Sequence, residues 1–103
     1  MSDPLYIEIS ALAAAQVRAA ETWWQLNRPN APGAIRSELE RASSLIALQP
    51  GIGTRARNTT LRGVRRLHLA RIRYDLYYRV IETPSRLEIL AFWHASRGNL
   101  PPI

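Results

Sequence analysis

Apolar and polar positions alternate along four short segments of the chain, and apolar residues recur every three or four residues along two longer ones. Alternation is typical of a strand with one buried side, and the longer period is typical of an amphipathic helix. The strand-like segments span residues 5–10, 64–69, 72–82 and 87–94, and the helix-like segments span residues 11–27 and 34–48. This order of elements predicts an α+β fold in which one strand and two helices precede three further strands.

The first helix has a suitable beginning and an apolar stripe. Ser10 can act as its N-cap, and the alanine-rich start favours helix formation. The expected buried stripe consists of Leu12, Ala15, Ala19, Trp23 and Leu26. Adjacent residues cannot share a helix face, so Trp24 is expected either in a second packing layer or as an exposed anchor for a partner.

The second helix follows a break at residues 28–33 that is rich in proline and glycine. Its polar side is expected to carry Glu38. Because the connection is short, the two helices are expected to form an antiparallel hairpin. A turn at residues 49–53 and a polar loop at residues 54–63 come next. The expected buried seam of this helix consists of Ile35, Leu39, Ala42 and Ile46, widened by Leu45 and Leu48.

The three C-terminal strands are joined by short connections, which predicts an antiparallel meander. The helices are expected to cover one face of this sheet, and the whole chain, residues 1–103, is expected to form a single domain. Strand periodicity places a set of polar side chains on the other, partly open face. That set consists of Arg66, His68, Arg73, Asp75, Tyr77, Arg79 and His94, with Arg97 near the rim.

Composition excludes several kinds of site. The chain has no cysteine, so it has no disulfide, thiolate metal site or cysteine nucleophile, and its two histidines lack the spacing of a zinc site. We therefore expect neither a metal nor a cofactor. No apolar run approaches membrane-spanning length, and the N-terminus lacks the features of a signal peptide. We expect a cytoplasmic protein without a membrane partner.

The net charge of +6 is unevenly distributed, and every basic residue is an arginine. Residues 55–79 contain eight arginines and one acid, Asp75, for a net charge of +7. A GC-rich genome would explain the missing lysine, whereas guanidinium groups also suit bidentate binding of carboxylate and phosphate. The concentration of charge indicates an acidic partner, either a nucleic acid or an acidic protein.

The polar sheet face also offers candidate catalytic groups. Cleavage of RNA by its 2′-hydroxyl needs a base, an acid and a cation. The residues that supply these groups are His68, His94, Arg66 and Arg97. The alternative is a solvated sheet face with an Arg73–Asp75 pair and cross-strand Arg–Glu pairs. The residue types favour this alternative over catalysis, but they favour a functional surface for binding an acidic partner.

Motifs distributed over the whole chain are similar to those of the RelE/ParE family of bacterial toxins from toxin–antitoxin modules. No single motif is specific, but their order and spacing together are. The motifs are Trp23–Trp24, Asn27–Arg28–Pro29, Ala31–Pro32, Pro50–Gly51–Ile52–Gly53, Gly63–Val64–Arg65–Arg66–Leu67, Arg73–Tyr74, Tyr77–Tyr78–Arg79–Val80 and Ile89–Leu90–Ala91–Phe92–Trp93–His94–Ala95–Ser96–Arg97–Gly98.

The resemblance implies a toxin that is neutralised by a cognate, acidic antitoxin whose C-terminal segment folds on it. The antitoxin would cover the helical hairpin and the sheet. Toxins of the RelE branch cut messenger RNA in the ribosomal A site, whereas those of the ParE branch poison DNA gyrase and have no known catalytic residues. The residues expected to contact the antitoxin are Trp24, Leu45, Leu48, Arg65 and Arg71.

Departures from the RelE pattern favour the ParE branch. The chain has no lysine, it has Asp75 where RelE-like nucleases often have an arginine, and its tail has no tyrosine. The motifs LYYRV and FWHASRG are more similar to ParE relatives. Gyrase inhibition by binding is therefore the first expectation, and ribosome-dependent cleavage of messenger RNA, or a basic adaptor that only binds its partner, are the alternatives. The expected gyrase contacts are Arg66, Arg73, Tyr77, Arg79, His94 and Arg97.

Overall fold

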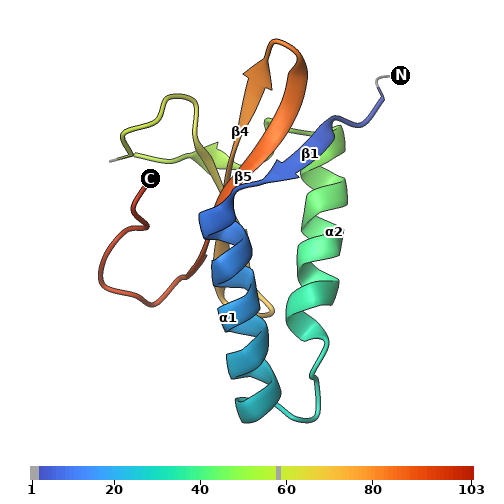
Figure 1. Cartoon of the computed structure of the whole chain (residues 1–103), viewed down its shortest axis with the longest axis vertical. Helices are drawn as coiled ribbons and strands as arrows, with labels where there is room; N and C mark the ends of the chain where they lie inside the picture. The colour runs from blue at the N-terminus through green and yellow to red at the C-terminus, as the bar shows by residue number, and fades with distance from the viewer. Residues whose placement is uncertain (1–2, 58) are drawn as a thin grey trace.

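The computed structural model describes residues 3–57 and 59–103. Figure 1 shows two antiparallel helices lying side by side over one face of a sheet, which confirms the α+β architecture. Met1 and Ser2 at the N-terminus, and Asn58 in the predicted polar loop, lie outside the described residues. The elements are β1 (Tyr6–Ile9), α1 (Ala11–Asn27), α2 (Ala34–Leu48), β2 (Thr54–Arg55), β3 (Arg65–Leu69), β4 (Tyr74–Glu82) and β5 (Ser85–His94).

The sheet has the strand order β1-β5-β4-β3-β2. The predicted meander of β3, β4 and β5 is confirmed, and β1 pairs with β5 in parallel. The prediction missed β2, a two-residue edge strand that pairs Thr54 with Arg66. It also began the third strand too early, because residues 70–73 form a turn in which the Arg73 amide donates to the Leu69 carbonyl at 2.8 Å.

Helix α1 begins as predicted, but it buries a different side. The Ser10 hydroxyl accepts a hydrogen bond from the Ala13 amide at 3.0 Å, as expected of an N-cap. The buried side chains are Ala13, Val17 and Ala20, whereas Leu26 of the predicted stripe is 78% exposed. Small side chains allow the helix to pack closely on the sheet, so the apolar stripe with the larger residues is not the buried one.

Helix α2 buries its predicted seam and, in addition, a carboxylate. Ile35, Leu39, Ala42 and Ile46 all belong to the main core. Glu38 was predicted on the polar side but is buried, and it accepts a hydrogen bond from Arg41 at 2.8 Å. This bond holds the pKa of Glu38 below its ordinary value, although burial acts in the opposite direction.

An irregularity in β5 determines which of its side chains face the helices. Tyr77 pairs with Ala91, but the next residue, Tyr78, pairs with Ile89, so Leu90 is an extra residue. Before this β-bulge, Ile89 packs in the main core, and after it Phe92 does. His94 pairs with Tyr74 and therefore also lies on the helix-covered face. Its predicted placement on the opposite face was wrong, because uninterrupted alternation was assumed.

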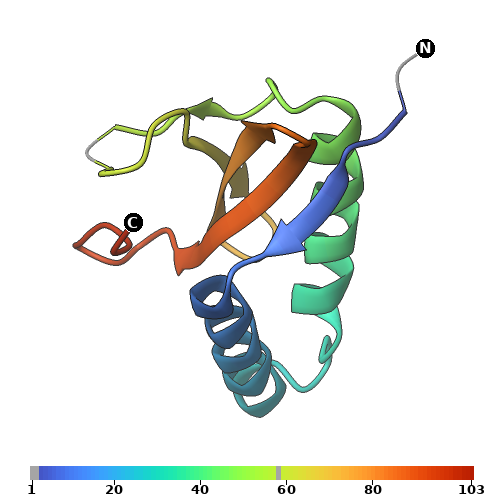
Figure 2. The ribbon, with the colours of Figure 1, turned by 45° about the horizontal axis from the view of Figure 1, so that its top comes forward.

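The second face of the sheet has a small core of its own. Val64, Tyr77, Leu90 and Ala91 are buried there, and they are closed over by Ala56, Leu61, Trp93 and Ile103. Figure 2 shows the C-terminal tail beside the loop that follows β2, and the Thr60 amide donates to the Ile103 carbonyl at 3.0 Å. The predicted open face is therefore partly covered, which leaves Tyr77 only 4% exposed.

The turn after α2 is fixed by a buried hydroxyl. The Tyr78 hydroxyl donates to the Pro50 carbonyl at 2.7 Å and accepts from the Gly53 amide at 2.9 Å. A Cβ atom at Gly53 would lie 2.7 Å from the Tyr78 oxygen, so this close approach requires glycine. Burial raises the pKa of the Tyr78 phenol above its ordinary value.

Candidate functional site: a basic and aromatic cleft

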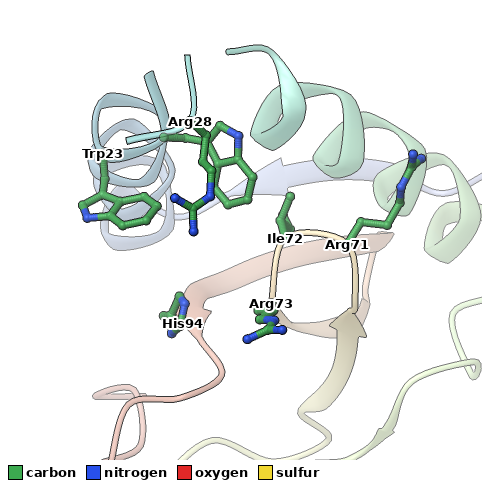
Figure 3. A pocket seen from close by; sticks show the side chains of 7 residues that line it. Trp23, Arg28, Arg71, Ile72, Arg73 and His94 are labelled. Atoms are coloured by element: carbon green, nitrogen blue, oxygen red, sulfur yellow. The ribbon is translucent and has the colours of Figure 1, made fainter. Parts of the chain in front are cut away.

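A cleft of about 360 Å³ opens where the end of α1, the turn at residues 70–73 and the end of β5 meet. Figure 3 shows Trp23 and Arg28 reaching it from the helix, Arg73 from the turn and His94 from the strand. An adjoining hollow of about 300 Å³ is lined by Trp23, Tyr74, His94 and Arg97. The residues that line the main cleft are Trp23, Trp24, Arg28, Arg71, Ile72, Arg73 and His94.

The helix side of the cleft combines two tryptophans with one arginine. Arg28 is the C-cap of α1, and its guanidinium carbon lies 5.5 Å from the Trp23 ring and 6.0 Å from the Trp24 ring. Cation–π attraction at these distances keeps the charge beside the aromatic surface. Trp24 packs against the core, which is the first of the two positions expected for it, whereas Trp23, expected in the buried stripe, is 46% exposed.

The turn side of the cleft is held by backbone contacts. Arg73 has a φ of 60°, in the left-handed region that residues other than glycine seldom adopt. Its carbonyl accepts a hydrogen bond from the Ala95 amide at 2.9 Å, which joins the turn to the segment after β5. The side chain of Arg71 is largely exposed and lies 3.8 Å from the Glu38 carboxylate. The turn therefore presents two guanidinium groups on a fixed backbone.

His94 is held in one orientation at the end of β5. Its Nδ1 accepts the Ser96 amide at 3.2 Å and lies 2.6 Å from the Ser96 hydroxyl. Because an amide can only donate, the neutral ring has its proton on Nε2. The ring meets Tyr74 edge-on, with 5.0 Å between the ring centres. Burial raises the pKa of Tyr74, and the charge of Arg97 opposes this in part, so the phenol is a hydrogen-bond donor at neutral pH.

Arg97 lines the adjoining hollow, whereas it was expected near the rim of the opposite face. Its guanidinium carbon lies 4.2 Å from the centre of the Trp93 ring. The Trp93 indole in turn donates to the Asn99 carbonyl at 3.0 Å. These contacts tie the tail to the end of β5 and limit the positions that Arg97 can take.

Two candidates lie on the opposite face, away from the cleft. His68 Nδ1 is 2.8 Å from the buried Asp75 carboxylate, and Arg66 pairs across strands with Tyr77. Asp75 thus pairs with His68 rather than with Arg73. The predicted Arg–Glu cross-strand pairing is confirmed by Arg79 and Glu88, whose nitrogen and oxygen are 3.0 Å apart. The candidate catalytic groups therefore do not form one cluster, since Arg66 and His68 are separated by the sheet from His94 and Arg97.

The residues expected to contact an antitoxin also divide between two places. Trp24 and Arg71 line the cleft together with Arg73 and His94. Leu48 is 58% exposed and lines a separate, mainly apolar groove of about 480 Å³ between β1 and α2. Leu45 is half-buried in α2. Arg65 donates to the Gly53 carbonyl at 2.7 Å, so it supports the turn after α2.

Sequence reasoning missed three residues of the site: Trp23 as an exposed residue and Arg28 in the cleft, and Tyr74 in the adjoining hollow. A signal was available for Arg28, because it directly follows a helix with two tryptophans near its C-terminal end and can meet both the helix C-terminus and their rings. Tyr74 was assigned to the buried face of its strand. It does face the helices and packs against the main core, but it is only partly buried and also lines the hollow beside Trp23. Strand periodicity gives the face of a residue and not how far it is exposed.

Within residues 3–57 and 59–103, no three histidine, aspartate or glutamate side chains gather in a way that could hold a metal ion. Among the helices of that same part of the chain, none has the length and apolarity needed to cross a membrane.

The fold is that of a small, basic α+β protein in which a helical hairpin covers one face of a five-stranded sheet. A sequence model of the family described as the ParE toxin of the parDE type II toxin–antitoxin system matches residues 7–98. This chain therefore belongs to the ParE toxin family, within the RelE/ParE toxins of type II toxin–antitoxin modules.

A solved structure described as a chromosomal ParDE toxin–antitoxin system from P. aeruginosa has a similar fold, with a TM-score of 0.71 at 20% sequence identity. The match covers 92% of this chain and 100% of that chain. No curated protein matches the sequence.

Proposed function

We propose that this toxin binds DNA gyrase and blocks its cycle without chemistry of its own, and that a cognate antitoxin neutralises it. Membership of the ParE family supports the class of target. The observation that carries the proposal is the β-bulge at Leu90, which places His94 on the helix-covered face while Arg66 and His68 lie on the other. Groups on opposite faces of a sheet cannot act together on one phosphodiester bond.

The basic and aromatic cleft is the proposed contact surface for gyrase. Trp, Tyr and Arg are the residues most enriched at the energetic centres of protein interfaces. The cleft and its adjoining hollow together offer Trp23 and Tyr74 beside the guanidinium groups of Arg28, Arg73 and Arg97. Arg66 and Tyr77 are less suited to this contact, because they lie on the opposite face, and Arg79 is already paired with Glu88.

The same cleft explains how an antitoxin would neutralise the toxin. Trp24 and Arg71, expected to contact the antitoxin, line it together with Arg73 and His94, expected to contact the target. An acidic segment of the antitoxin in the cleft would exclude gyrase by occupying its contact surface. Charge pairing should make association faster at low salt, and an association rate that does not change with ionic strength would contradict this part of the proposal.

The experiment is a gyrase assay with purified toxin free of antitoxin, in which supercoiling and trapped cleavage complexes are followed on plasmid DNA. We expect loss of supercoiling and accumulation of cleaved plasmid. Replacing Trp23 and Arg73 by alanine should raise the toxin concentration needed for half-inhibition by about tenfold or more. Arg18→Ala, an exposed position on α1 outside the cleft, is the matched control. Normal supercoiling at a large excess of wild-type toxin would refute the proposal.

One observation favours the alternative function, ribosome-dependent cleavage of messenger RNA. Tyr74, His94 and Arg97 line a single hollow and supply a hydrogen-bond donor, a proton-transfer group and a cation. Primer extension on ribosome-bound messages would test this. Cleavage that is lost in His94→Ala but retained in His68→Ala would establish a nuclease site in the hollow, and intact messages with the wild-type toxin would exclude it.

A further inference from the structure

A second basic surface lies along the β2–β3 edge of the sheet, at the opposite edge from β1. Residues 54–66 contain five arginines and no acid. Three of them, Arg55, Arg57 and Arg66, line a hollow of about 380 Å³ together with Thr54, Ala56, Tyr77 and Leu100. We call these three arginines the edge arginines.

The edge arginines have no carboxylate partner within the described residues. Ion pairs occupy Arg36, Arg41, Arg79 and Arg86 elsewhere, and none of those formed by residues 3–57 and 59–103 includes an edge arginine. All three side chains belong to exposed residues. Their guanidinium groups are therefore available to a ligand without the loss of an existing pair.

The backbone that carries the edge arginines is held by the fold. Thr54 and Arg55 pair with Arg66 and Arg65, and the Ala56 amide donates to the Val64 carbonyl at 2.9 Å. Beneath them, the small core around Tyr77 is closed by the tail. A ligand would meet arginines on a fixed backbone, so the entropy lost on binding is limited to their side chains.

The chemistry of this hollow suits phosphate better than a protein partner. Leu100 is the one exposed large apolar side chain that lines it among the described residues, whereas the cleft contains two tryptophans. Protein interfaces need an apolar or aromatic centre, but contacts to a nucleic-acid backbone need only donors and positive charge. We propose that the edge arginines bind the phosphate backbone of duplex DNA. The choice of DNA over RNA rests on the proposed action on gyrase.

With this site, the toxin would have two separate binding surfaces. The cleft would contact the enzyme, and the edge arginines would contact the DNA on which the enzyme acts. The contact would be independent of DNA sequence, because phosphates carry no base information.

The test is binding of the purified toxin to a short duplex of random sequence, without gyrase, followed by fluorescence anisotropy at several salt concentrations. We expect replacement of the three edge arginines by glutamine to weaken binding at least about tenfold at ~50 mM salt and to lower the slope of log K against log salt by about three. The three Lys replacements keep the charge and should retain most of the binding. The matched control, Arg18→Gln with Arg36→Gln and Arg86→Gln, removes the same charge elsewhere.

Several results would overturn the proposal. Equal weakening in the control variant would mean that net charge alone attracts DNA. Equal or tighter binding of duplex RNA would reject DNA as the ligand, and equal binding of poly-glutamate would indicate an acidic protein instead. Circular dichroism of each variant establishes that it is folded. The DNA-binding assay contains no gyrase, so its result is independent of the gyrase assay. A toxin that inhibits gyrase without binding DNA would overturn only this proposal, and a toxin that binds DNA without inhibiting gyrase would overturn only the proposed function.

Discussion

The two faces of the sheet are closed by different means. On one face, two helices cover a core that includes Tyr78, Leu87 and Phe92. On the other, a loop and the C-terminal tail cover four buried residues. A face closed by helices gains stability from many packed side chains, whereas a face closed by irregular segments has fewer contacts to lose. The helix-covered face should therefore dominate stability, and the other face should tolerate change.

The strongest test of this comparison removes a large side chain from each face. Phe92 is buried under the helices and stacks on Tyr74, with 4.6 Å between the ring centres. Phe92→Ala should lower the free energy of unfolding by about 3–5 kcal/mol, and Leu90→Ala, on the other face, by about 2 kcal/mol. Urea denaturation measures both values. A loss at Leu90 equal to that at Phe92 would show that the two faces contribute alike.

A matched pair of hydroxyl deletions sharpens the comparison at adjacent residues. Tyr78→Phe leaves the Pro50 carbonyl and the Gly53 amide without their partner and should cost about 1–3 kcal/mol. Tyr77→Phe removes a hydroxyl for which the described residues provide no hydrogen-bond partner, and it should change stability by less than about 0.5 kcal/mol. Thermal unfolding of both variants checks this. Similar losses would contradict the role assigned to Tyr78.

The cover of the second face can be tested at the end of the tail. Ile103→Ala trims a half-buried side chain and should cost about 1 kcal/mol. It should also speed hydrogen exchange at the Thr60 amide, which donates to the Ile103 carbonyl. Amides of α1 serve as the internal control. Unchanged exchange at Thr60 would show that the tail does not protect the loop.

The smallest expected effect concerns Glu38, the buried carboxylate of α2. Because the pKa of Glu38 in the folded protein lies below its ordinary value of 4.5, its charge stabilises the fold above that pH. This contribution should be lost as the pH falls from 4.5 through the lower folded value. Unfolding between neutral and acid pH should thus show a weaker acid dependence in Glu38→Gln. Glu40→Gln, exposed on the same helix, should leave the dependence unchanged.

The sequence predicted the features that depend on neighbouring residues. Both helices have their predicted bounds, because the Ser10 cap and the break at residues 28–33 are local signals. The side of α1 that is buried was not predictable in this way. Leu12 and Ala13 each begin a stripe of apolar residues, and packing against the sheet determines that the stripe of Ala13 is the buried one. The covered second face depends on contacts between Ile103 and residues more than forty positions away.

The candidate site was predicted in its residue types but not in its geometry. His94 and Arg97 were expected beside Arg66 and His68, and a single bulge separates them because it reverses the alternation of β5. No pattern of apolar residues marks Leu90 as extra, since the residues on both sides of it are apolar. That Arg28 lines a cleft could not be predicted without knowing where the turn at residues 70–73 lies, and this turn is far from Arg28 in sequence.

The extra residue at Leu90 also affects how this chain should be compared with its relatives. Deleting it would restore regular pairing, because Ile89 would still face Tyr78 and Ala91 would still face Tyr77, so His94 would still lie toward the helices and Trp93 away from them. Two homologues that differ by this single residue would therefore differ in strand length and still present the same later side chains to a partner. An alignment gap at this point in β5 is therefore compatible with an unchanged binding surface, whereas counting residues through the bulge assigns every later side chain to the wrong face.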